Sequence, residues 1–330
     1  MKVFEHQKYS KIYPHHDQIN HNWDWSKFSD DPRTQNIDVH IGSSIDFSKI
    51  RDDKISVNIN GEYPNSWFGG SRRGQCIPHN INVEKLFDYI FCQCKQTSHA
   101  RGYPFVPYAY DFTHILSKIG FNDIDDVKKD IDVFMCATCP GEYWEGERHP
   151  VWSWYKIMEK FNHSFCNRDW PSHNVSWEKM QESQARSKIT IVFSDFIGST
   201  PMCREFAKEN FPWIKFKNND GMKPVTPQPK PRILNAASTK SLILCHRGPF
   251  VGEAPPYNSA IEDYLDPSTD FIYFDDDDDL ERKLHLILDD YENPKYKKMI
   301  ESAYDKMINN FDIHSWYEKY IIPIAEKGKP

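Results

Sequence analysis

Apolar and polar positions alternate most regularly in the last hundred residues, where helices and strands can be read in turn. A helical segment, RILNAAST, leads into the apolar run SLILCH, and the run FIYF follows after a loop. Leu280, Leu284, Ile287 and Leu288 then share one helical face, with spacing i, i+4, i+7 and i+8. This alternation predicts a parallel α/β unit, and such units bind ligands at the carboxyl ends of their strands.

Five aspartates, Asp275–Asp279, stand where this helix begins. Negative charge there suits the positive end of the helix macrodipole. Five consecutive acids cannot all face one ion, so we interpret the run as a helix start and not as a metal site. A further helix is expected around Tyr296–Asn309, and HSWYEKYIIPI closes the chain.

The first half of the chain shows strands with period-two alternation. Strands are expected over Ile37–Ile41, over Lys54–Asn60 and in DYIFCQC, and YPFVPYAYDF reads as an extended connector. Later, HPVWSWYKIMEKF and SWEKMQESQARS are expected as helices, KITIVFSDF as a buried strand and YNSAIEDYL as another helix. The five prolines between Phe211 and Arg232 predict irregular structure. We expect an N-terminal α/β domain over residues 1–125 and a second domain over residues 126–311.

Composition limits the class of protein. With 39% hydrophobic residues in 330, a packed core is expected. The net charge of −7 disfavours a general nucleic-acid coat, although it leaves room for a local basic cleft. No apolar run is long enough to span a bilayer, and the N-terminus lacks the apolar region of a secretory signal. Eight scattered cysteines favour reduced thiols over a disulfide framework. We therefore expect a cytoplasmic protein; the sequence does not fix its oligomeric state, and a homodimer is compatible with it.

The order of segments over residues 176–322 resembles the C-terminal domain of GT-B glycosyltransferases, in particular the group 1 type related to spore-maturation glycosyltransferases. The residues that carry the resemblance are Arg232, Ala236, Ala237, Ser241, the stretch Phe271–Leu288 and the aromatic close Ser315-Trp316-Tyr317. Two positions depart from the family pattern. Asn235 stands where many relatives have Glu, and Pro227 stands eight residues before it, so the E-x7-E signature of retaining members is absent.

The resemblance implies an α/β GT-B fold with two Rossmann-like domains facing a cleft. It implies that the second domain binds a nucleotide-sugar donor, that the first holds the acceptor, and that no metal or other cofactor is strictly required. It also implies that a C-terminal helix, residues 312–330, crosses back to the first domain.

Arg232 is the principal candidate for binding the donor diphosphate. It opens the predicted helix after a loop that contains Lys215, Lys217, Lys223 and Lys230. Arginine suits bidentate contacts with oxygen atoms, and a helix N-terminus adds aligned N–H groups. The lysines are as readily explained as solvated loop residues. The resemblance places Asn235 in the same donor site.

The loop after SLILCH carries a second group of candidates, His246, Arg247, Gly252 and Glu253. Glycine allows close approach of the backbone to a ligand, Glu253 could hold sugar hydroxyls and Arg247 could balance phosphate charge. The alternative is a surface loop with an ordinary ion pair.

Other strand ends supply further candidates. Thr138 and Gly141 follow the first strand of the second domain, and Ser194 follows KITIVF, where a helix cap near Pro201 is an equal alternative. Cys136-x-x-Cys139 lacks the further ligands of a zinc site, and Pro140-Gly141 indicates a turn, so buried structural thiols are favoured.

On the acceptor side, Glu62 in NGEYP is the candidate carboxylate at a strand end. Inverting sugar transfer needs a general base to deprotonate the attacking hydroxyl. A solvated turn residue is the alternative, and His15, His16 and Asp17 are weaker candidates. We thus expect a glycosyltransferase that moves a sugar from a UDP- or GDP-linked donor to a glycan or protein-linked acceptor, with Glu62 and Arg232 as catalytic residues. The alternatives are an enzyme acting on modified DNA bases and a non-catalytic nucleotide-sugar-binding protein of the same fold.

Overall fold

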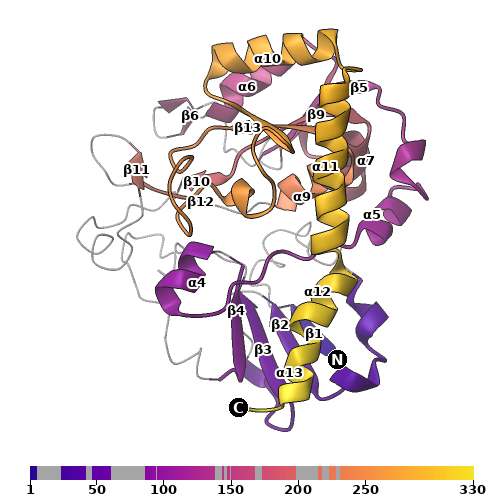
Figure 1. The fold of residues 1–330 in the computed structure, drawn as a ribbon, viewed down its shortest axis with the longest axis vertical. Coiled ribbons are helices and arrows are strands. Elements are labelled where there is room, and N and C mark those ends of the chain that lie inside the picture. The colour runs from indigo at the N-terminus through magenta and orange to yellow at the C-terminus, as the bar shows by residue number, and fades with distance from the viewer. Residues whose placement is uncertain are drawn as a thin grey trace.

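A computed structural model of the chain contains two separate parallel β-sheets with helices around them (Figure 1). The structure describes residues 1–5, 24–41, 47–60, 86–93, 95–137, 143–144, 147–148, 150–167, 173–197, 215–217, 223–227 and 231–330. No helix within these ranges is long and apolar enough to cross a membrane.

The first sheet belongs to the N-terminal part of the chain. Within the described residues its strands run in sequence order, β1 (Lys2–Glu5), β2 (Ile37–Ile41), β3 (Ile55–Asn60) and β4 (Tyr89–Cys92), and every neighbouring pair is parallel. Ile55, Val57 and Ile59 of β3 are buried on one face, as their alternation predicts. Strand β1 was not predicted from the sequence, since only Val3 and Phe4 of its four residues are apolar.

The second sheet has the order β14-β13-β9-β5-β8 in the part of the chain that the structure describes, again with parallel neighbours. Its strands are β5 (Ile131–Cys136), β8 (His163–Cys166), β9 (Ser187–Val192), β13 (Leu242–His246) and β14 (Phe271–Phe274). Ile243 and Cys245 enter one core, whereas Leu242 and Leu244 enter the core on the opposite face. Helices cover both faces, which explains why these strands are almost continuously apolar.

One face of the second sheet packs against α9 (Pro231–Ser238) and the C-terminal half of α11 (Pro294–Phe311). The other face packs against α6 (Pro150–Met158) and α10 (Asp277–Asp289). Helix α7 (Trp177–Ala185) lies beside α9 (Figure 1). Asp276 caps α10 by accepting a hydrogen bond from the Asp279 N–H, so the predicted role of the aspartate run at this helix start is confirmed.

Two chain segments run between the sheets and pair with each other. The connector that contains Tyr110 meets the junction between α11 and α12 (Ile313–Tyr320). The Tyr110 N–H donates to the Phe311 carbonyl at 2.8 Å, and the Ile313 N–H donates to the Tyr110 carbonyl at 3.0 Å. Helices α12 and α13 (Ile322–Lys327) then pack on the core of the first sheet (Figure 1). The proposed domain boundaries remain predictions.

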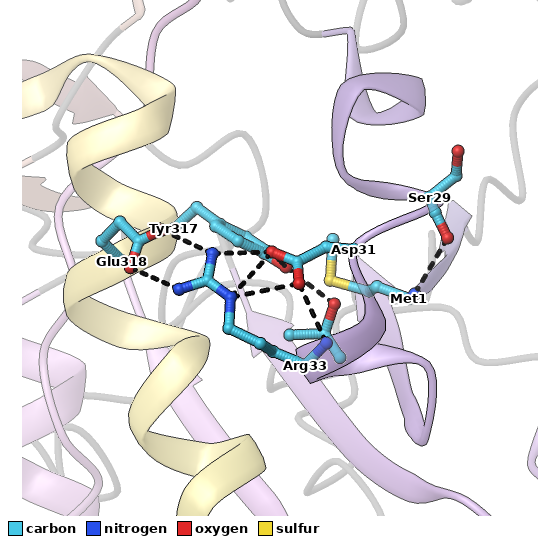
Figure 2. A network of polar contacts seen from close by, with 7 residues as sticks. Met1, Ser29, Asp31, Arg33, Tyr317 and Glu318 are labelled. Atoms are coloured by element: carbon cyan, nitrogen blue, oxygen red, sulfur yellow. Dashed lines mark hydrogen bonds and ion pairs between the residues drawn. The ribbon is translucent and has the colours of Figure 1, made fainter.

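A polar network fastens α12 to the N-terminal region (Figure 2). Figure 2 shows the Arg33 guanidinium between the carboxylates of Asp31 and Glu318, and Nη2 donates to each at 2.7 Å. The Tyr317 hydroxyl donates to Asp31 at 3.0 Å. The hydrogen bond from Arg33 lowers the pKa of Asp31 to about 2. Phe28 stacks on the Tyr317 ring with 4.1 Å between centroids, so apolar and charged contacts act together.

Several further elements differ from the sequence predictions. The proline-rich stretch contains β11 (Lys215–Lys217) and β12 (Lys223–Pro227), and β12 lies between β11 and β10 (Asp195–Ile197) in a small antiparallel sheet. The segment YNSAIEDYL forms only the short 3-10 helix η6 (Ala260–Asp263), so the expected helix is shorter than predicted. Helices α4 (Lys95–Arg101) and α5 (Phe112–Lys118) were not predicted.

The two parts of the chain also meet through α4. The Lys95 ammonium lies 2.6 Å from the Asp263 carboxylate, which is 2% exposed. Gln96 Nε2 donates to the Asn258 carbonyl at 3.5 Å, and the Tyr108 N–H donates to the Tyr264 hydroxyl at 3.2 Å. The segment Asn258–Tyr264 therefore touches the N-terminal part at several points.

Candidate functional site

The carboxyl edge of the second sheet carries a cluster of aromatic rings. Phe193 follows β9, His246 ends β13, Phe274 ends β14 and Trp154 comes from α6. The Trp154 ring lies 4.9 Å from the His246 ring, 5.3 Å from Phe274 and 6.0 Å from Phe193, centroid to centroid. We call these four residues the aromatic cluster. Because parallel strands all end at this edge, the topology collects their terminal side chains here.

Arg232 reaches this edge from the opposite face of the sheet. It lies in the first turn of α9, and its Nη1 donates to the Cys136 carbonyl, at the end of β5, at 2.6 Å. The guanidinium carbon lies 4.9 Å from the centre of the Phe193 ring. Gln184 of α7 donates to the Arg232 carbonyl at 3.4 Å. The guanidinium is thus held against the sheet edge and beside the aromatic cluster.

The start of α9 carries a positive side chain. Its first turn, Pro231–Leu234, contains a cation and no acidic residue. The first N–H groups of a helix have no partner within the helix, and the macrodipole gives this end partial positive charge. Arg232 adds to that potential. The start of α9 therefore favours an anion, such as a phosphate, in its vicinity.

His246 is the second predicted residue that the fold brings to this place. Burial lowers the pKa of its imidazole, although Asp275 and Asp277 act in the opposite direction. The ring is therefore neutral at pH 7, with one nitrogen able to donate a hydrogen bond and the other able to accept one. Arg232 and His246 are linked through Phe193 and Trp154 of the aromatic cluster.

Arg247 and Glu253 lie further out, each in an ion pair. Arg247 Nε donates to Asp275 at 2.6 Å, and its guanidinium lies over the Tyr273 ring at 4.8 Å. Lys215 Nζ donates to Glu253 at 2.5 Å and to the Pro249 carbonyl at 2.5 Å. These pairs match the ordinary-ion-pair alternative for this loop. Gly252 adopts φ +88, a conformation that favours glycine.

Ser194 is buried beneath the loop that follows β13. Its hydroxyl lies 2.7 Å from the Ser259 hydroxyl, and both residues are fully buried. A neighbouring close contact was not predicted: a Cβ on Gly248 would lie 1.5 Å from Oδ2 of Asp195. A side chain at position 248 would therefore displace the Asp195 carboxylate.

The remaining predicted residues divide into two groups. Asn235 is 5% exposed in the middle of α9, and its carbonyl accepts hydrogen bonds from Ser238 and Thr239. Outside the described residues lie Glu62, Thr138 and Gly141, as well as the weaker candidates His15, His16 and Asp17. The donor-binding and catalytic roles of all these residues remain predictions.

Sequence reasoning missed Trp154, Phe193 and Gln184 as residues of this region. Trp154 has helical spacing with other apolar residues, which predicts core packing and nothing more specific. Gly248 could be selected from the sequence, because it lies in the loop after a strand of a parallel α/β unit, where glycine lets the backbone approach a ligand. Among the described residues, no group of three or more His, Cys, Asp or Glu side chains could hold a metal ion.

Comparison with known proteins reveals similarity at the level of the fold. No protein-family model matches the chain, and no curated protein matches its sequence. An α-glucosyltransferase in complex with UDP and a 13-mer DNA containing a central A:G mismatch has 11% identity and a TM-score of 0.52, covering 88% of this chain and 80% of that one. A complex of α-glucosyltransferase with UDP and a 13-mer DNA containing an HMU base gives the same values. Anabaena HepE in complex with UDP has 6% identity and a TM-score of 0.49, covering 91% and 81%.

These structural neighbours are GT-B glycosyltransferases. The predicted fold class, α/β of the GT-B type with two Rossmann-like domains, is thereby confirmed. At 11% identity the likeness establishes the fold and not the reaction. The relation to spore-maturation glycosyltransferases remains a prediction.

Proposed function

We propose that this protein is a glycosyltransferase that transfers a sugar from a UDP- or GDP-linked donor. The observation that carries the proposal is the position of Arg232, in the acid-free first turn of α9 and beside the carboxyl edge of the second sheet. Ligands of open α/β sheets bind at such an edge. The GT-B fold is compatible with this reaction, and its neighbours include complexes with UDP.

The reaction would be a direct displacement at the anomeric carbon. The acceptor oxygen forms the new bond, the bond to the diphosphate oxygen breaks, and the diphosphate leaves with additional negative charge. Arg232 and the α9 N–H groups would stabilise that charge, since preorganised donors contribute most where charge develops. The acceptor proton would pass to a carboxylate, for which Glu62 is our candidate. No step of this scheme requires a metal or another cofactor.

A nucleotide-binding panel tests the proposal. Titration calorimetry with UDP, GDP and ADP, with the corresponding glucose conjugates and with uridine as a control without phosphates, would measure donor binding. We expect at least one diphosphate to bind clearly more tightly than its nucleoside. Release of glucose from the bound donor, or its transfer to an acceptor, would then separate an enzyme from a non-catalytic binding protein. Failure to bind any nucleotide would contradict both.

The acceptor has two candidate classes. A glycan or protein-linked acceptor suits the net charge of −7, which repels a polyanion. A modified base in DNA is the second class, because α-glucosyltransferase complexes with DNA are among the neighbours that have a TM-score of 0.52. Incubation with radiolabelled UDP-glucose and either a 13-mer duplex containing HMU or a mixture of oligosaccharides would distinguish them. Radiolabel found in the DNA alone, and not in the oligosaccharides, would identify a modified DNA base as the acceptor.

A further inference from the structure

Gln181 of α7 is a buried side chain whose hydrogen-bonding groups are unused. It is 0% exposed, and neither Nε2 nor Oε1 has a hydrogen-bond partner among the described residues. Native proteins satisfy the great majority of their buried polar atoms, and an amide with both ends unsatisfied lowers stability. An unexplained group of this kind indicates either a missing partner or a functional role.

The position of Gln181 on α7 relates it to α9. Gln184 follows it by three residues and donates to the Arg232 carbonyl at 3.4 Å. Residues three apart share a face of a helix, so Gln181 lies on the side of α7 that faces α9. The two helices lie side by side in Figure 1. The residue before it, Met180, contacts Cys136, with 3.3 Å between the sulfur atoms, and the Cys136 carbonyl accepts from Arg232.

The direction of α7 places Gln181 nearer to the ligand-binding edge than Gln184. Helix α7 runs between the end of β8 and the start of β9, so its N-terminus lies toward the carboxyl edge of the parallel sheet. Three residues rise by about 4.5 Å along a helix, and side chains lean toward its N-terminus. Since the Gln184 amide reaches the Arg232 carbonyl in the first turn of α9, Gln181 lies about one helical turn nearer to the carboxyl edge than this contact.

We propose that Gln181 is a further donor-binding residue, and this inference rests on the proposed function. Its Nε2 would donate to a phosphate oxygen held between Arg232 and the start of α9. Its Oε1 would accept a hydrogen bond from a hydroxyl group of the same donor. A nucleoside diphosphate sugar supplies both phosphate oxygens and sugar or ribose hydroxyls, whereas inorganic pyrophosphate lacks the latter. Binding would thus complete an amide that the free protein leaves unsatisfied.

Gln181→Met tests this assignment, because methionine matches glutamine in length and favours a helix. Loss of two unsatisfied polar atoms should leave the melting temperature unchanged or raise it by about 2–4 °C. Affinity for UDP-glucose or GDP-mannose, whichever the wild type binds, should nevertheless fall by roughly tenfold or more. Pyrophosphate affinity should fall by a smaller factor. Gln181→Leu provides a second apolar variant, and Glu182→Gln is the control expected to bind like the wild type, because the partly exposed Glu182 carboxylate pairs with Lys179 and Arg186.

Each outcome decides the question. An unchanged or higher melting temperature together with a lower donor affinity supports the proposal. An unchanged donor affinity in both apolar variants overturns it, and so does a parallel loss of stability and affinity, which would indicate a structural role. If the wild type binds no nucleotide at all, the proposed function fails, and the role of Gln181 fails with it.

Discussion

Helices α9 and α10 both begin at the carboxyl edge of the second sheet, but their first turns carry opposite charge. In α10, Asp276 accepts from the Asp279 N–H at 2.9 Å, and Asp279 accepts from the Asp275 N–H at 3.0 Å and from Lys283 at 2.6 Å. In α9, the first turn carries Arg232 and no acid. The start of α10 is thus neutralised by its own residues, whereas that of α9 retains a positive potential for a ligand.

A cation lies near each end of α9, and only the one at the C-terminal end suits the helix macrodipole. At the C-terminal end, Lys129 donates to the carbonyls of Thr239 at 2.5 Å and of Ala185, the last residue of α7, at 2.6 Å. A cation is favourable there because this end of a helix is negative. Arg232 occupies the unfavourable end. Helix α11 likewise begins with Lys295 and Lys297 and no acidic residue, so it is the place of Arg232 at the carboxyl edge of the sheet, and not its charge alone, that indicates a ligand site.

Replacing Arg232 should have the largest effect on ligand binding. Arg232→Ala removes a cation that would form charge-assisted bonds with the diphosphate, so UDP affinity should fall about 10- to 100-fold. Arg232→Asp, which makes the start of α9 resemble that of α10, should reduce it further. Calorimetry would measure both, with Arg282→Ala on the exposed side of α10 as the control. Undiminished UDP binding in Arg232→Asp would show that the positive start of α9 does not bind the ligand.

Lys129 should make stability depend on pH. Burial lowers its pKa to about 7, with a contribution from Lys240, although Asp125 acts in the opposite direction. Between about pH 7 and the usual lysine value of 10.5, the unfolded chain holds a proton that the folded protein lacks. The free energy of unfolding should therefore rise with pH across this window. Urea unfolding at several pH values should show a smaller rise for Lys129→Met than for the wild type or the exposed control Lys118→Met; equal slopes would contradict this assignment.

Removing the cap of α10 should affect stability but not binding. Asp276→Ala deletes the side chain that accepts from the Asp279 N–H, and loss of an N-cap costs about 1 kcal/mol. The melting temperature should fall by about 2–4 °C. UDP affinity should equal that of the wild type, since the start of α10 is already neutralised. A loss of affinity comparable with that of Arg232→Ala would show that both helix starts serve the ligand.

The smallest of the predicted effects concerns the stabilisation by Asp279, which is lost at acidic pH. Partial burial opposes ionisation of Asp279, but hydrogen bonds from Lys283, the Asp275 N–H and Arg282 outweigh it and lower its pKa. Its contribution to stability is complete above the usual value of 3.8 and is lost as the pH falls through the lower, folded value. Asp279→Asn should therefore cost about 0.5 kcal/mol at pH 7 and less at pH 2. Chemical denaturation at the two pH values would measure the difference, and a cost that is independent of pH would count against it.

Many elements of the second sheet and its surrounding helices could be predicted, because helical periodicity and capping depend on residues that are close together in the sequence. The spacing of Leu280, Leu284 and Ile287 and the aspartates before them specify an amphipathic helix and its start. Likewise, Arg232 could be selected from its place between a loop and a short helix. The aromatic cluster could not, since Trp154 and Phe193 are far apart in the sequence and apolar spacing alone does not reveal which rings meet.

By itself, the sequence determined the type and order of most elements of the second sheet, because periodicity and capping act between residues a few positions apart. The tertiary structure determined which side chains contact one another. It paired Arg247 with Asp275 and Glu253 with Lys215, and it buried Gln181 beside α9 without a hydrogen-bond partner among the described residues. Partner choice depends on distances between segments that only packing brings together, and these distances leave no periodic trace in the chain.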